Sequence, residues 1–138
     1  MSLAFLLALG LLGLGLLLNG RRRAAHDTAH PDATTLTALT RAGSDLSQVH
    51  DLEFYLYLPT ESAAAHVAET LRADGFATQV EPDPEPGGHE WLCLATRQMA
   101  PHLAELERLR GRLSSLASAA GGEYDGWGAT VVAPPKRG

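Results

Sequence analysis

Hydrophobic and polar residues alternate strictly along residues 50–58. One face of this stretch is apolar and carries Leu52, Phe54, Leu56 and Leu58. The other face carries Asp51, Glu53, Tyr55 and Tyr57. A period of two residues predicts a β-strand with one face on the core. We therefore expect the two tyrosines and the two acids to lie on the opposite, open face.

Helical spacing replaces the alternation after Pro59, and two further strands follow. A helix is expected to begin at Thr60 and to end at Asp74-Gly75. Its buried face should hold Ala64, Val67, Ala68 and Leu71. Residues 76–81 and 90–96 have the length and composition of strands, and the polar residues 82–88 between them predict a hairpin.

Pro101 opens the longest helical pattern, which continues until Gly121-Gly122 end it. The hexapeptide Glu123-Tyr124-Asp125-Gly126-Trp127-Gly128 follows and combines two aromatics, two acids and two glycines. Glycines permit backbone angles and close approaches that a Cβ would block. We therefore expect the hexapeptide to be the bulged start of a final strand that covers residues 129–132.

The order of these elements, β-α-β-β-α-β, predicts the fold class. With a right-handed crossover in each half, it gives an α+β, ferredoxin-like sandwich with a four-stranded antiparallel sheet. Both helices then cover one face of the sheet, and the first and third strands are central. The side on which Trp91 and Cys93 lie is left open, because both faces of residues 91–95 are apolar.

Residues 3–18 form an unbroken apolar run. A helix over residues 1–18 would span roughly 27 Å, close to the hydrocarbon core of a bilayer. Arg21-Arg22-Arg23 follow, and the positive-inside rule keeps them in the cytoplasm. We expect one N-terminal transmembrane helix in the inner (cytoplasmic) membrane, with the N-terminus outside and the domain in the cytoplasm. A signal peptide cleaved near Ala24-Ala25 is the alternative.

The chain is thereby divided into four expected segments. They are a membrane anchor over residues 1–20, a juxtamembrane linker over 21–42, a folded domain over 43–133 and a basic tail over 134–138. Within the linker, residues 32–41 have the spacing of a short helix, with Asp32 as its N-cap.

Charge is distributed unevenly along the chain. Residues 44–133 hold fourteen Asp or Glu, five Arg and no Lys, a net charge of −9, whereas both ends of the chain are basic. An acidic domain disfavours direct binding to nucleic acid, whose phosphates need neutralising. It suits a basic protein partner held by salt-sensitive contacts. An acidic surface that serves solubility alone is the alternative.

No catalytic constellation emerges from the sequence. The single cysteine, Cys93, lies in an apolar strand pattern, which is typical of a buried and inert thiol. The six histidines are scattered, and no Cys/His spacing suits zinc. We therefore expect a protein that is not an enzyme and that has no cofactor and no metal.

The pattern from Gly43-Ser44-Asp45 to the hexapeptide resembles the regulator of ribonuclease activity B family, the protein inhibitors of ribonuclease E. The similarity covers residues 43–130. It implies a ferredoxin-like domain that is not catalytic and whose acidic surface meets a basic region of ribonuclease E. Family members are soluble and have an acidic C-terminal tail, whereas this chain has an apolar N-terminal run and a short basic tail. A modulator of RNA decay at the membrane, acting on ribonuclease E or a related nuclease, is therefore expected.

Eight residues are predicted to bind the partner: Glu123, Asp125, Trp127, Tyr124, Tyr55, Tyr57, Asp51 and Glu53. Aromatic residues often anchor interfaces, and the acids would meet a basic partner. The alternative for Trp127 and Tyr124 is core packing, and for Asp125 it is hydrogen bonding within the bend. Two other functions stay open. One is a small-molecule sensor or a dimeric ferredoxin-like enzyme, with a cavity lined by Tyr55, Tyr57 and Trp91. The other is a purely structural membrane adaptor.

Overall fold

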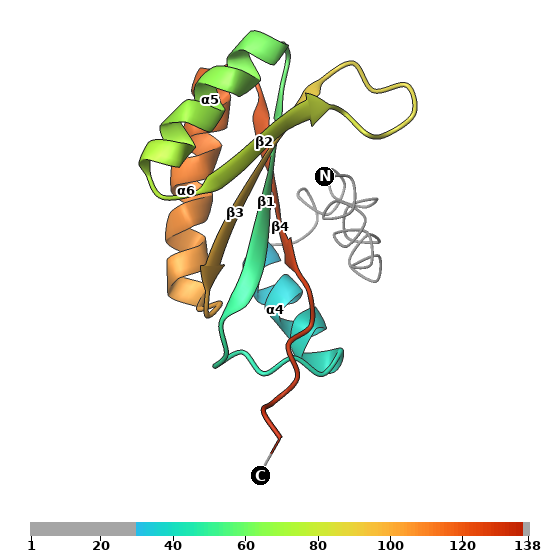
Figure 1. The fold of residues 1–138 in the computed structure, drawn as a ribbon, viewed down its shortest axis with the longest axis vertical. Helices are drawn as coiled ribbons and strands as arrows, with labels where there is room; N and C mark the ends of the chain where they lie inside the picture. The colour runs from blue at the N-terminus through green and yellow to red at the C-terminus, as the bar shows by residue number, and fades with distance from the viewer. Residues whose placement is uncertain (1–29, 137–138) are drawn as a thin grey trace.

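The computed structural model describes residues 30–136, which form three helices and four strands (Figure 1). In chain order they are α4 (Pro31–Arg41), β1 (His50–Leu58), α5 (Glu61–Ala73), β2 (Ala77–Pro82), β3 (Trp91–Met99), α6 (Leu103–Ala119) and β4 (Glu123–Ala129). The strands form one sheet in the order β2-β3-β1-β4, and every neighbouring pair is antiparallel.

The elements from β1 to β4 confirm the predicted βαββαβ order, with β1 and β3 in the centre of the sheet. Figure 1 shows α5 and α6 side by side on one face of the sheet. Their apolar residues pack against the helix-facing residues of β1 and form the main core. Within this core, the rings of Phe54 and Phe76 meet edge to face at 5.5 Å. The arrangement is the ferredoxin-like one that the element order predicts.

The predicted transmembrane helix, cleavage site and arginine run fall on residues 1–29, outside the described residues. Within residues 30–136, no helix combines the length and the hydropathy that crossing a membrane requires.

The register of the central strands determines which side chains face the helices. Phe54 pairs with Ala95, and Leu56 pairs with Cys93, and all four belong to the main core. The alternate residues of both strands therefore point to the opposite face. This register answers the question that the sequence left open, because Cys93 lies on the helix side and Trp91 packs against the same core.

The last strand differs from its prediction. It spans Glu123–Ala129, so the hexapeptide is itself the strand, whereas residues 130–132 are not part of it. A register shift against β1 separates the pair Leu56–Tyr124 from the pair Phe54–Trp127. Gly126, at φ 105°, supplies the left-handed conformation in this bulge. The extra residue lets both aromatics reach the main core, which strict alternation would forbid.

Gly122 joins α6 to β4 where the backbone of β1 passes close by. A Cβ at this position would lie 1.9 Å from the carbonyl oxygen of Tyr57 and 2.8 Å from Cδ1 of Leu58. The backbone of β1 thus occupies the space where a side chain would be. The predicted Gly-Gly helix stop is confirmed, and its second glycine is needed for contact with the central strand.

Helix α4 packs against α6 and β4. It begins at Pro31, one residue earlier than predicted, and His30 rather than Asp32 takes the N-cap position, without a side-chain hydrogen bond. Asp32 instead lies in the first turn and is buried. The helix that the sequence placed in a linker is therefore fastened to the sheet and to α6.

A buried polar cluster joins the chain after α4 to the chain after β4. Ser44 Oγ lies 2.7 Å from Nε2 of His50 and accepts a hydrogen bond from the backbone N–H of Val132 at 2.8 Å. The neighbouring backbone N–H of Asp45 donates to the carbonyl of Val132 at 2.7 Å. The Gly-Ser-Asp motif thus has a structural role, because it ties both ends of the domain together.

Candidate functional site

The sheet face opposite the helices is acidic. Asp51 and Glu53 of β1 lie there. Glu81 of β2 pairs with Leu92, and Glu123 of β4 pairs with Tyr57, so these two acids lie on the same face. We call these four residues the acidic face. The strand residues described on this side include no Lys and no Arg. No basic side chain of these strands therefore balances the four carboxylates on this face.

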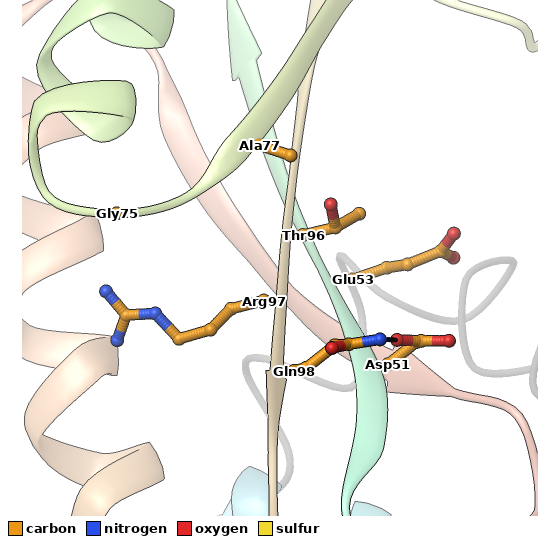
Figure 2. Close-up of a pocket in the computed structure, with 7 residues that line it drawn as sticks. All are labelled: Asp51, Glu53, Gly75, Ala77, Thr96, Arg97 and Gln98. Carbon is orange, nitrogen blue, oxygen red and sulfur yellow. Dashed lines mark hydrogen bonds between the residues drawn. The ribbon is translucent and has the colours of Figure 1, made fainter.

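A shallow hollow of about 530 Å³ opens at one end of the acidic face (Figure 2). Its lining residues are Asp51, Glu53, Gly75, Ala77, Thr96, Arg97 and Gln98. Gln98 Nε2 donates to Asp51 Oδ1 at 2.8 Å. Figure 2 shows Glu53 and Thr96 on one side of the sheet, with Arg97 pointing away to the helix side. The hollow therefore offers carboxylate, amide and hydroxyl oxygens, which suit a cationic side chain such as Arg or Lys.

A hydrogen bond from Tyr55 holds the Glu53 carboxylate in place. The Tyr55 hydroxyl donates to Glu53 Oε1 at 2.9 Å. Burial raises the pKa of the Glu53 carboxyl above its usual value, and the hydrogen bond from Tyr55 offsets this shift only in part. The stability that Glu53 contributes is therefore fully present below its unfolded-state pKa and is lost as the pH rises through the folded-state pKa.

The two tyrosines do lie on the predicted face, but they are not exposed. Tyr55 is 6 % exposed and Tyr57 2 %, and they form a second apolar cluster with Leu92 and Leu94. Trp91 is on the helix side, so it does not join Tyr55 and Tyr57 in the cavity that the alternative function requires. The two tyrosines are thus packed below the surface, and the charged groups that solvent can reach on this face are carboxylates.

The hexapeptide residues fall into two groups. Glu123 is exposed at the start of β4, and Asp125 is half-buried in the bulge. Tyr124 packs against the main core, and Trp127 is buried within it. Their positions favour the core-packing alternative for both aromatics. Glu123 keeps the position that binding to a partner requires.

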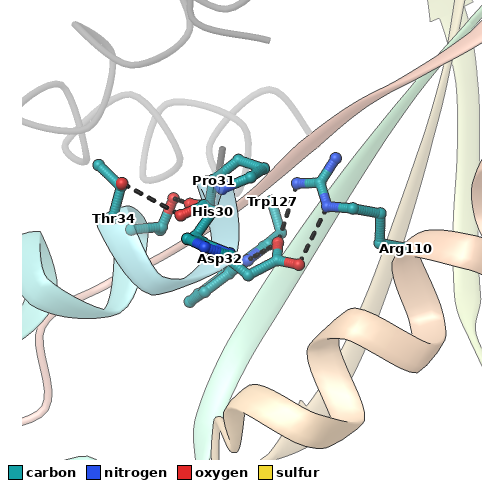
Figure 3. A network of polar contacts seen from close by, with 7 residues as sticks. His30, Pro31, Asp32, Thr34, Arg110 and Trp127 are labelled. Carbon is teal, nitrogen blue, oxygen red and sulfur yellow. Dashed lines mark hydrogen bonds and ion pairs between the residues drawn. The ribbon is translucent and has the colours of Figure 1, made fainter. Parts of the chain in front are cut away.

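A polar network holds the hexapeptide to the start of α4 (Figure 3). The Arg110 guanidinium donates to both oxygens of Asp32, through Nε at 3.0 Å and Nη2 at 2.9 Å. Trp127 Nε1 donates to Asp32 Oδ1 at 3.2 Å. Arg110 also lies over the Tyr124 ring, 5.3 Å from its centroid. Asp32 thus joins three elements that are distant in sequence.

Two of these residues escaped the sequence reasoning. Asp32 was expected to cap its helix, whereas it accepts hydrogen bonds from Arg110 and Trp127. On the same helix, Arg108 pairs with Glu105, whereas Arg110 turns inward to Asp32. Glu81 was also missed, although its place in the alternation of residues 76–81 was a usable signal.

The described residues hold no arrangement suited to covalent or metal chemistry. Burial raises the pKa of the Cys93 thiol to about 11, and its side chain is fully buried. Ser44 and His50 are in contact, but both are buried, and Ser44 is engaged by Val132. Among residues 30–136, no group of His, Cys, Asp and Glu is placed to hold a metal ion.

The fold and this site define a small α+β domain with two helices on one sheet face and an acidic surface on the other. The family model described as "Regulator of ribonuclease activity B" matches residues 30–129. The chain therefore belongs to this family of non-catalytic regulators of ribonuclease activity. A comparison with curated proteins gives no match.

The family match begins at residue 30 and thus includes α4. This extent agrees with the packing of α4 against α6 and β4 and with the network at Asp32. The acidic residues on the sheet and the fastened helix are accordingly parts of one family domain.

Proposed function

We propose that the chain regulates a ribonuclease of the ribonuclease E type by binding a basic segment of it on the acidic face. The observation that carries this proposal is the distribution of charge. Four carboxylates occupy one face of the sheet, and the described strand residues of that face include no base. A basic segment laid across this face would occupy a region of the nuclease and thereby change its activity.

The hollow gives the proposal a specific contact. A Lys or Arg side chain of the partner would enter between Asp51 and Glu53, where Gln98 and Thr96 supply further oxygens. Partner binding would restore a counter-charge to Glu53, whose own burial disfavours its charged form. Part of the cost of keeping this carboxylate charged would then be recovered in the complex.

Reversing two exposed charges of the acidic face is expected to weaken nuclease binding by at least about tenfold. The variant Asp51→Lys/Glu123→Lys changes residues at the surface, so the fold should persist. The matched control is Glu61→Lys/Glu69→Lys, which makes the same change in net charge on exposed positions of α5. Binding to purified ribonuclease is measured at about 0.1 M and about 0.5 M salt.

The proposal requires that the control bind within about threefold of the unaltered protein and that salt weaken binding. An equal loss in both variants would indicate a general effect of net charge, and binding that persists in the first variant at high salt would exclude the acidic face. The alternative of a cavity lined by Tyr55, Tyr57 and Trp91 is not favoured, because Trp91 lies on the other side of the sheet.

We propose further that residues 1–20 anchor the domain at the inner membrane, with the domain in the cytoplasm. The support is the apolar run over residues 3–18, followed by three arginines. Fractionation of cells that produce the tagged full chain tests this proposal. Recovery in the membrane fraction after a high-salt wash is expected, and recovery in the soluble fraction alone would overturn it.

A further inference from the structure

Three arginines converge on a second hollow, which lies on the helix side of the sheet. Arg97 from β3 and Arg108 and Arg112 from α6 line this space of about 290 Å³. Asp74, Phe76 and Leu109 complete its wall. Three of the five arginines of residues 44–133 thus gather at one point of an otherwise strongly acidic domain.

Ion pairing accounts for two of the three positive charges. Arg108 pairs with Glu105, and Arg112 Nη2 lies 2.5 Å from Asp74 Oδ2. Arg97 forms no ion pair within 4.0 Å among residues 30–136. The hollow therefore retains one guanidinium that no carboxylate contacts within 4.0 Å, and Glu105 acts on it at longer range.

Arg97 is also held in a fixed orientation. Its Nη2 donates to the backbone carbonyl of Asp74 at 2.8 Å. Its guanidinium lies over the ring of Phe76, 3.9 Å from the ring centroid, and Phe76 is itself buried. A stacked guanidinium loses little entropy when it forms further hydrogen bonds, and it keeps N–H donors for a ligand.

We propose that this hollow is a binding site for a small oxyanion, either phosphate or a carboxylate. Arg97 would provide a guanidinium free of any direct ion pair together with oriented donors, and Arg108 and Arg112 would strengthen the local positive potential. Planar guanidinium groups bind both anions through paired N–H···O bonds. Arg97 also lines the hollow of the acidic face, but its guanidinium points to the helix side (Figure 2), away from the carboxylates that would repel such a ligand.

Titration with inorganic phosphate and, separately, with sodium acetate tests the site at constant ionic strength. Binding is followed by NMR of the arginine Nε–H groups in the folded protein. Arg97→Gln is expected to weaken the binding of the preferred anion by at least about tenfold. The matched control is Arg72→Gln, which removes an arginine outside the hollow whose Nη1 bonds Thr78 at 2.6 Å, and it should leave binding unchanged.

A second variant is needed because Arg97 also bonds the end of α5, so that Arg97→Gln alone could weaken the fold. Glu105→Gln removes the partner of Arg108 and frees a second positive charge in the hollow. Anion binding should then become about two- to threefold tighter. Phosphate binding that exceeds acetate binding, or the reverse, identifies the ligand class. Binding of neither anion, or equal binding by the protein and both variants, would overturn the proposal.

Discussion

Replacing Gly122 by Ala is expected to destabilise the domain by about 3 kcal/mol or more. The new Cβ would lie 1.9 Å from the carbonyl oxygen of Tyr57, and this obstacle is backbone of a central strand rather than a movable side chain. Either β1 or the start of β4 must shift, and their pairing at Tyr57–Glu123 would be lost. Urea unfolding followed by circular dichroism measures the effect.

Gly111→Ala is the matched control for this substitution. Gly111 lies inside α6, and a Cβ there would have no neighbour within 4 Å. Alanine should therefore stabilise the helix by about 1 kcal/mol, because it removes the conformational freedom of a helical glycine. If Gly122→Ala lowers the free energy of unfolding by less than about 1 kcal/mol, the backbone can move apart at this junction at little cost. The close approach at Gly122 would then not be important for stability.

Removing the carboxylate of Asp32 is expected to cost about 3 kcal/mol of stability. Asp32→Ala would leave the guanidinium of Arg110 without its partner and the indole N–H of Trp127 without an acceptor. The side chain of Asp32 is 2 % exposed, but that of Arg110 is 30 % exposed, so solvent would offset part of the loss. The free energy of unfolding in urea and hydrogen exchange of α4 measure the result.

Two further variants show whether the loss comes from the buried pair. Arg108→Ala breaks an exposed pair in the same helix and should cost less than about 1 kcal/mol. The double variant Asp32→Ala/Arg110→Met should be more stable than Asp32→Ala alone, because no unpaired charge is then left beside the core. If the double variant is the less stable of the two, the network does not act through charge pairing.

The fold was largely predictable because its signals are local. The alternation over residues 50–58, the helix start at Thr60 and the Gly-Gly stop each depend on neighbouring residues, and the structure confirms all three. The Thr60 hydroxyl accepts the backbone N–H of Ala63 at 3.0 Å, as an N-cap does. The acids of β1 were found for the same reason, since period two assigns them to one face.

The parts that sequence reasoning missed depend on distant contacts. Nothing near Asp32 indicates Arg110 or Trp127, which are 78 and 95 residues away. The extent of β4 was misjudged because the bulge at Gly126 breaks the alternation that normally marks a strand. The burial of Tyr57 also depends on its cross-strand neighbour Leu92 and on β4, rather than on its own position in the pattern.

The opposite chemistry of the two sheet sides gives the domain an electric dipole. The helix layer is nearly neutral. The five arginines of residues 44–133 all lie on the helix side, and five acids lie there with them: Glu61, Glu69, Asp74, Glu105 and Glu107. The opposite face carries the four carboxylates of the acidic face. In the electric field of a basic partner, this dipole would orient the domain so that its acidic face points toward the partner before the surfaces touch. Salt should therefore slow the association rate more than it changes the dissociation rate.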